Sequence, residues 1–132
     1  LTRKGDTINY TYDDLNRLEQ KSGVGIETTD YDYDIASRLT DISSAPSSIS
    51  YTYDDLNRVI QATQTLPYTL YYEYDDAGSR TKLTYPDNTY ITYEYDELNR
   101  ITYIRNQAYS IIASYTYDIL SRRATLDYAK AK

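Results

Sequence analysis

Residues 93–101 read Tyr-Glu-Tyr-Asp-Glu-Leu-Asn-Arg-Ile, and five variants of this segment occur elsewhere in the 132-residue chain. The first tyrosines of the six copies are 20 to 22 residues apart, at positions 10, 31, 51, 72, 93 and 115. Recurrence at a fixed period of this size is typical of repeat proteins, in which each unit buries its apolar surface against its neighbours. The sequence therefore predicts a single array of similar units over residues 1–132.

Each copy favours a β-hairpin. Its two tyrosines are separated by one residue, which is Thr, Asp or Glu, so a strand would carry an aromatic face and a polar face. Apolar residues after the turn, such as Leu39 and Ile42, are three apart, which fits a helix or a strand with a bulge. The abundance of Thr, Val, Ile and Tyr favours strands. We expect an all-β fold of antiparallel hairpins, two strands per repeat, in a curled or spiralling sheet.

The turn of each hairpin is predicted from the residues after the second tyrosine. They are Asp, two variable residues, then Asn, Ser or Gly, and then Arg. Asp can accept hydrogen bonds from the turn, while Asn or Gly tolerates the left-handed conformation that closes a type I turn with a bulge. Ser37 and Ser121 fit less well, because Ser enters that region at a higher cost. The fourth copy, Asp75 to Arg80, has one extra residue and predicts a wider turn.

The residues that recur are interpreted as architectural: the tyrosines as a packing ladder, Asp as the start of the turn and Arg as its counter-charge. They are Tyr10, Tyr12, Asp13, Arg17, Tyr31, Tyr33, Asp34, Arg38, Tyr51, Tyr53, Asp54, Arg58, Tyr72, Tyr74, Asp75, Arg80, Tyr93, Tyr95, Asp96, Arg100, Tyr115, Tyr117, Asp118 and Arg122. The links between hairpins hold all three prolines, Pro46, Pro67 and Pro86.

Composition excludes several functions. The chain has 19 tyrosines but no His or Cys, so it can form no disulfide, His-based triad or cysteine nucleophile. A net charge of -6 disfavours nucleic acids and anionic membranes as partners, and no apolar run is long enough for membrane insertion. Stacked acidic turns could offer oxygen ligands to Ca²⁺, but no known ligand spacing is present. We predict no enzymatic activity, catalytic residue, metal or cofactor.

The Tyr-x-Tyr-Asp-x-x-(Asn/Ser/Gly)-Arg unit resembles the YD repeat of the Rhs-repeat family, from about Tyr10 to Tyr128. This family includes bacterial Rhs and polymorphic toxins, shell subunits of insecticidal toxin complexes, and teneurins. Residues 74–100 resemble its pattern most, although Asn88 stands where a glycine is usual. The resemblance implies a spiral of antiparallel hairpins that winds, in long members, into a hollow shell around a passenger polypeptide. No counterpart of the family's self-cleaving segment lies before Lys132, so autoproteolysis is assigned to no residue.

The sequence predicts a non-enzymatic structural protein, an extracellular or cell-surface β-scaffold that stacks end to end into a filament or coat. Its expected partners are further copies of itself or the remainder of a longer repeat protein, because the chain begins at Leu1 and is already repeating by Tyr10. Two alternatives stay open. The tyrosines could stack on glycans in a binding module, or the chain could be a segment of a toxin-encapsulating Rhs shell.

Overall fold

The computed structural model describes residues 7–65 and 68–128. They form strands and turns, and the described part of the chain contains no helix that could cross a membrane. The strands are β1 (Ile8–Tyr12), β2 (Leu18–Gly23), β3 (Ile26–Tyr33), β4 (Leu39–Ser44), β5 (Ser47–Tyr53), β6 (Val59–Gln64), β7 (Tyr68–Tyr74), β8 (Arg80–Thr84), β9 (Tyr90–Tyr95), β10 (Ile101–Asn106), β11 (Ile111–Tyr117) and β12 (Arg123–Tyr128). The predicted all-β fold is confirmed.

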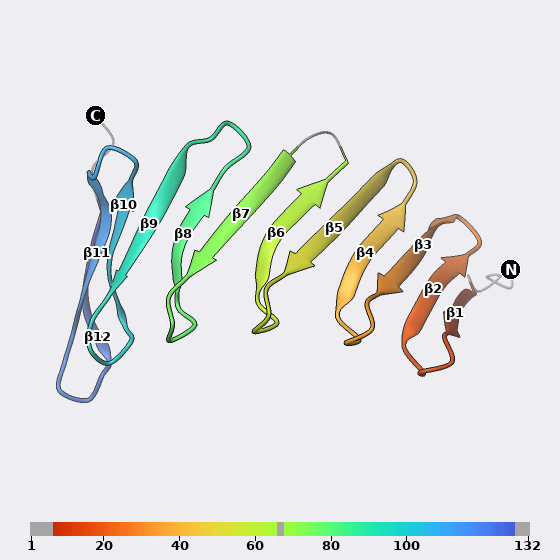
Figure 1. Cartoon of the computed structure of the whole chain (residues 1–132), viewed down its shortest axis with the longest axis horizontal. Coiled ribbons are helices and arrows are strands. Elements are labelled where there is room, and N and C mark those ends of the chain that lie inside the picture. Colours follow the sequence, from red (N-terminus) through yellow and green to blue (C-terminus); the bar gives the residue numbers. More distant parts are fainter. Residues whose placement is uncertain (1–6, 66–67, 129–132) are drawn as a thin grey trace, which may run out of the picture. The chain divides into compact units, whose positions relative to one another are not determined.

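The chain divides into two compact units, residues 1–69 and 70–132. Within each unit, hydrogen-bonded neighbours are consecutive in sequence and antiparallel, as Figure 1 shows. Each of the six recurring segments joins an odd-numbered strand to the next even-numbered strand, so each repeat is one hairpin, as predicted. The single array over residues 1–132 and the curl of the whole sheet stay predictions.

Every hairpin contains the bulge that the apolar spacing predicts. In β3 and β4, Asp32 is opposite Asp41 but Tyr33 is opposite Leu39, so Thr40 has no partner across the ladder. The same one-residue shift occurs beside the second tyrosine of the other five hairpins. Because a bulge reverses the alternation of faces, Leu39 and Ile42 both join the tyrosine face although they are three apart.

The turns also follow the predicted pattern. In the third hairpin, the Asp54 main-chain N–H donates to the Arg58 carbonyl (3.0 Å), and Asn57 has a φ of 63°. Ser37 and Ser121 adopt the same left-handed conformation, with φ of 63° and 60°, despite its cost for Ser. The chain therefore keeps one turn geometry where the residue type does not favour it.

The wider turn predicted for the fourth hairpin is wrong. The Asp75 N–H donates to the Ser79 carbonyl (2.9 Å), which is the same five-residue closure as in the other turns. Gly78 takes the left-handed position, with a φ of 86°. Ser79 therefore stands where the other turns have Arg, and Arg80 is already the first residue of β8, opposite Tyr74.

At the opposite ends of the strands, a second set of links connects consecutive hairpins. Pro46 lies in the two-residue link between β4 and β5, and Pro86 lies between β8 and β9, as predicted. The predicted link at Leu66 and Pro67 lies outside the described residues. In the second unit, the links at 85–89 and 106–110 repeat the five-residue closure, with Asn88 and Tyr109 left-handed.

Both units are one sheet thick in their described parts. No described residue of the first unit is buried, and in the second only Ala113 and Ser79 are. The tyrosine face carries cross-strand rows such as Tyr31, Ile42 and Ile49. The polar face carries Thr52 and Gln61 in the first unit. In the second unit it also holds Tyr71, Tyr90 and Tyr103, so it is less uniformly polar than predicted.

Candidate functional site

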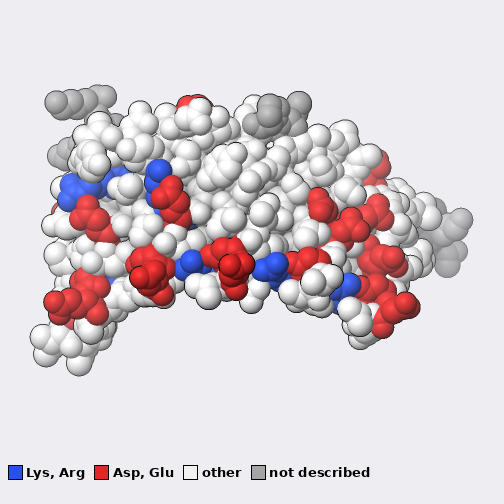
Figure 2. All heavy atoms as spheres, viewed as in Figure 1, with Lys and Arg blue, Asp and Glu red and all other residues white. Residues whose placement is uncertain are grey.

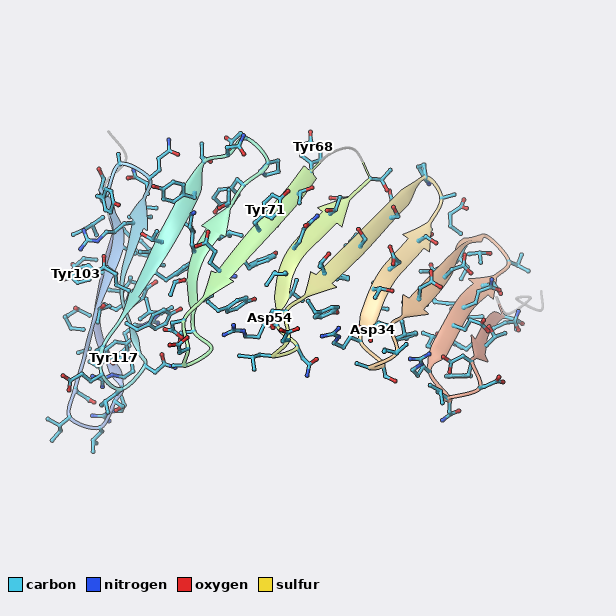
Figure 3. All side chains as sticks on the ribbon, viewed as in Figure 1. Asp34, Asp54, Tyr68, Tyr71, Tyr103 and Tyr117 are labelled. Carbon is cyan, nitrogen blue, oxygen red and sulfur yellow. The ribbon has the colours of Figure 1, made fainter. Side chains whose placement is uncertain are left out.

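The Asp and Arg of each turn pair with one another in five hairpins, at distances of 2.6–2.8 Å. These ion pairs are Asp13–Arg17, Asp34–Arg38, Asp54–Arg58, Asp96–Arg100 and Asp118–Arg122. Figure 2 shows acidic and basic side chains alternating along the turn edge of the first unit, and Figure 3 shows Asp34 and Asp54 at that edge. In these five turns the Arg side chain thus lies within ion-pair distance of the Asp of its own turn.

The aspartate is held by the turn itself. The Oδ1 atom of Asp34 accepts the main-chain N–H groups of Ala36 and Arg38, both at 2.9 Å, and Oδ2 accepts Nε of Arg38 at 2.6 Å. The N–H of Arg38 and its guanidinium lower the pKa of the Asp34 carboxyl below its ordinary value, against a smaller opposing effect of desolvation. These bonds favour the ionised carboxylate in the folded chain.

The same arginine also contacts the next repeat. The guanidinium carbon of Arg38 lies 4.8 Å from the ring centroid of Tyr53. Its Nη1 atom donates to the Asp54 carbonyl (3.2 Å) and to Oδ1 of Asn57 (2.8 Å). A guanidinium over an aromatic face is attracted by the ring quadrupole. We call this set an inter-repeat clamp: the Arg of one turn, the second tyrosine of the next hairpin and the turn that follows that tyrosine.

The inter-repeat clamp recurs in both units. Arg17 lies 4.6 Å from the ring of Tyr33 and Arg100 lies 4.4 Å from the ring of Tyr117. Their Nη1 atoms donate to the hydroxyls of the left-handed serines, Ser37 (3.1 Å) and Ser121 (3.2 Å). The left-handed residue therefore both closes its own turn and receives the arginine of the preceding repeat.

The second tyrosine adds a hydrogen bond in the opposite direction. Its hydroxyl donates to the carbonyl of the residue that begins the return strand of the preceding hairpin, at 2.7–3.0 Å. The pairs are Tyr33–Leu18, Tyr53–Leu39, Tyr95–Arg80 and Tyr117–Ile101. Burial raises the pKa of the Tyr53 and Tyr95 hydroxyls, so both stay protonated donors.

One junction is built differently. Ser79 occupies the arginine position of the fourth turn, and its hydroxyl donates to the side-chain oxygen of Asn99 in the next turn. Arg80, one residue later, lies 4.6 Å from the ring of Tyr93 and donates to its hydroxyl at 3.0 Å. At this junction a serine hydroxyl thus stands where other turns have a guanidinium. The arginine one residue later contacts the first tyrosine of the next hairpin, and not the second.

The first tyrosines of the later repeats share the face of the second tyrosines and are half-buried. They are Tyr31, Tyr51, Tyr72, Tyr93 and Tyr115. Tyr10 and Tyr12, in the first hairpin, are exposed. The structure brings the recurring residues together as a ladder between repeats, and not around a single pocket.

The acidic pairs form no visible metal site. Within residues 7–65 and 68–128, no three Asp or Glu side chains are arranged to hold a metal ion. On the polar face of the second unit, the ion pairs Lys82–Glu73 (2.8 Å) and Arg105–Glu94 join neighbouring strands. The two cations also lie over tyrosine rings, Lys82 over Tyr90 and Arg105 over Tyr103, at 4.7 Å each.

Sequence reasoning missed the contact from each arginine to the next repeat. It assigned Arg to its own turn because Asp lies only four positions before it. The missed signal is a second recurring spacing, because the second tyrosine of the next hairpin lies 15 to 17 residues after each of these arginines, as in Arg38 to Tyr53 and Arg100 to Tyr117. It also took Arg80 as the counterpart of the other arginines, whereas Ser79 holds that position.

Comparison with known families matches residues 33–120, about two thirds of the chain, to the family described as Teneurin YD-shell. Similar solved structures include TcdB2-TccC3-Cdc42, with 19% identity and a TM-score of 0.75 over 89% of this chain and 7% of that chain. TcdB2-TccC3 without its hypervariable C-terminal region has 19% identity and a TM-score of 0.76 over 89% of this chain and 7% of that chain.

The pore of the Photorhabdus luminescens Tc holotoxin has 18% identity and a TM-score of 0.74, over 90% of this chain and 7% of that chain. This chain thus spans less than a tenth of the length of these relatives. A search of curated protein sequences found no match. Because the family model matches about two thirds of the chain, the chain belongs to the Teneurin YD-shell family of YD-repeat proteins.

Proposed function

We propose that the chain is a structural wall segment of a YD-repeat shell. The inter-repeat clamp supports this proposal more than any other observation. The guanidinium of Arg38, for example, contacts Asp34 in its own turn and both Tyr53 and Asn57 in the next hairpin. Side chains that could bind or transform a ligand are thus used to join one repeat to another, which is what a wall requires.

A shell role also agrees with the relatives. Solved structures that share this fold include TcdB2-TccC3 assemblies and a Tc holotoxin pore. The identity to them is 18–19%, which supports a common fold. We propose that this chain, like other YD-repeat segments, acts as part of a longer repeat protein and contributes wall area to it.

We propose further that the chain has no enzymatic activity. It contains no His or Cys, and the first aspartate of most turns is tied to its own turn by two main-chain N–H groups and an arginine. A carboxylate held in this way is a weak general base, because its pKa is lowered and its oxygens are already occupied. Activity in a broad hydrolase assay that Asp34→Asn abolished without unfolding the chain would contradict this proposal.

We place the protein outside the cell or at its surface. The proposal rests on the family, whose name includes the teneurins, and on the toxin assemblies among the similar structures. Protease treatment of intact source cells tests it. Loss of the chain's signal without lysis supports an external location, and protection until lysis contradicts it.

Electron microscopy of the native protein that carries this segment tests the shell role. A short epitope inserted after Asp87, in an exposed link, would mark the segment with an antibody fragment. We expect a hollow particle with the label on its wall. A solid particle, or a label on a separate appendage, would contradict the wall assignment while leaving the fold untouched.

Glycan binding is the alternative function. Tyr33, Tyr53 and Tyr117 carry the guanidinium of the preceding repeat, which covers one face of each ring. The exposed ring of Tyr71 on the polar face is the better candidate for stacking on a sugar. Glycan-array binding that is lost in Tyr71→Ala, with unfolding unchanged, would favour this alternative over a purely structural role.

A further inference from the structure

Tyr109 occupies a backbone position that the rest of the chain gives to other residue types. Eight turns and links of the described chain close with the same five-residue hydrogen bond, and the fourth residue of each is left-handed. Seven of these residues are Asn, Ser or Gly: Asn16, Ser37, Asn57, Gly78, Asn88, Asn99 and Ser121. The eighth is Tyr109, with a φ of 58°. This conformation is unfavourable for a bulky residue, because the Cβ atom lies too close to the main chain.

The side chain of Tyr109 gives the fold nothing that would offset this cost. It is 76% exposed, and it makes no hydrogen bond or ring contact with the described residues. Other groups hold the link: Oδ1 of Asn106 accepts the N–H groups of Ala108 and Ser110, both at 3.0 Å. Nη1 of Arg105 donates to the Tyr109 carbonyl at 3.4 Å. A strained residue whose side chain its own fold does not need indicates a use outside the fold.

The exposure of Tyr109 does not follow from where the sequence ends. Its link joins β10 to β11, and the next strands on both sides, β9 and β12, are present. The preceding link, at 85–89, has the link of Tyr109 as its neighbour one repeat later, yet Pro86, Asp87 and Asn88 remain exposed. An adjoining repeat thus leaves the tip of a link open to solvent, and a longer chain would leave Tyr109 accessible in the same way.

The groups around the ring favour an uncharged ligand. Residues 106–117 contain no charged side chain. Arg105, directly before the link, is already paired with Glu94. Two further residues of the link, Gln107 and Ser110, are exposed, and their side chains have no hydrogen bond within the described part of the chain. The tip of the link therefore presents an aromatic ring together with an amide and a hydroxyl.

Both faces of the Tyr109 ring are free of cations. The second tyrosines of the clamps, such as Tyr33, Tyr53 and Tyr117, have a guanidinium 4.4–4.8 Å from the ring centroid. Among the described residues, no Lys or Arg lies over Tyr109 in this way. A sugar ring has a face of C–H groups that can stack on such an aromatic ring. Its hydroxyls can bond to amide and hydroxyl side chains, which both donate and accept.

We propose that Tyr109 stacks on a neutral sugar and that Gln107 and Ser110 bond to the hydroxyls of this sugar. The site lies on the link between the fifth and sixth hairpins, away from the clamps and the turn edge. It is independent of the wall role, because a wall segment can carry it and a segment of another assembly can carry it equally well.

An array of neutral di- to tetrasaccharides of hexoses and N-acetylhexosamines, probed with the labelled 132-residue chain, tests the proposal. We expect binding to at least one of them, and titration calorimetry with that oligosaccharide then gives its affinity. Tyr109→Asn should weaken binding at least about tenfold, because it removes the stacking surface. Tyr109→Phe keeps the ring and should bind within about threefold of the wild type.

The stability of the same variants separates binding from folding. Asn tolerates the left-handed backbone better than Tyr, so Tyr109→Asn should raise the unfolding midpoint by roughly 2–5 °C while it weakens binding. Asn88→Tyr is the matched control, because it places the strained residue at the same position of the preceding link. It should lower the midpoint by a similar amount and leave the affinity for the sugar unchanged.

Three results overturn the proposal: no oligosaccharide on the array binds, Tyr109→Asn binds as tightly as the wild type, or Tyr109→Asn unfolds at a lower temperature. If the ring instead anchors a protein, Tyr109→Asn is stabilised but the array stays blank. Binding that is lost in Tyr71→Ala and kept in Tyr109→Asn would place the sugar on the polar face, and it also contradicts the proposal. None of these results bears on the wall role, which the labelled particle tests separately.

Discussion

A single arginine illustrates how the repeats hold one another. Arg38 reaches Asp34 four residues before it and Tyr53 fifteen residues after it, so one side chain serves two hairpins. Lys could supply the charge, but only a planar guanidinium can pair with a carboxylate, lie over a ring and donate to a carbonyl at once. This position of the repeat therefore requires Arg for its planar geometry as well as for its charge.

The role of the second tyrosine's hydroxyl can be tested by comparing Tyr53 with Tyr12, because residues 51–58 and 10–17 have the same sequence. Tyr53→Phe removes the hydrogen bond to the Leu39 carbonyl (2.7 Å) and should lower the free energy of unfolding by about 1 kcal/mol. Tyr12→Phe changes the same position of the same sequence, where the ring is exposed and no repeat precedes it in the described chain. We expect its effect to be within about 0.5 kcal/mol.

Chemical denaturation of the two variants measures the difference. Equal effects at positions 12 and 53 would mean that the hydroxyl acts within its own hairpin, against the contact between repeats.

Acid should destabilise the chain in a defined pH range. The pKa values of Asp13, Asp34, Asp54, Asp96 and Asp118 are lowered in the folded chain from an ordinary 3.8. A lowered pKa stabilises the fold above the unfolded pKa, and this stabilisation is lost as pH falls through the folded pKa. The unfolding midpoint should therefore drop steeply below about pH 4.

Asp34→Asn provides the control for this prediction. It removes one titrating carboxylate, so its midpoint should depend less on pH than that of the wild type. A wild-type midpoint that stays constant below about pH 4 would contradict the role of the ionised turns.

At the scale of the element, the hairpin is what the sequence predicts best. Alternation of Tyr and polar residues gives the strand, Asp and Asn give the turn, and the three-residue apolar spacing gives the bulge beside Leu39. The fourth turn was mispredicted because Arg80 was aligned with the other arginines, whereas the hydrogen bond from Asp75 to Ser79 sets the closure. Contacts between hairpins were not predictable within one repeat, because their partners lie in two repeats.

The left-handed turn position can be tested with reciprocal changes. Ser37 has a φ of 63° and accepts Arg17 through its hydroxyl, whereas Asn57 at the same position accepts Arg38 through Oδ1. Asn tolerates a left-handed backbone better than Ser. Ser37→Asn should therefore stabilise the chain by roughly 0.5–1 kcal/mol, and Asn57→Ser should destabilise it by a similar amount. Thermal unfolding of both variants measures this, and changes of the same sign would contradict it.

At the scale of the whole molecule, the chain depends on contacts between neighbours. In the described residues only Ala113 and Ser79 are buried, so no enclosed core supports either unit. Cross-strand packing, the tyrosine hydroxyls and the inter-repeat clamps must therefore supply most of the stability. An array built in this way gains stability from each added neighbour, which suits the wall role proposed above.

A double-mutant cycle between Arg38 and Tyr53 tests this account most directly, because the two residues belong to successive repeats and meet only through the clamp. The cycle compares the unfolding free energies of the wild type, Arg38→Ala, Tyr53→Ala and the double variant. We predict a coupling energy of about 1 kcal/mol, the value expected for a guanidinium over a partly buried ring. Additive effects, with no coupling between the two positions, would contradict the claim that the recurring residues join one repeat to the next.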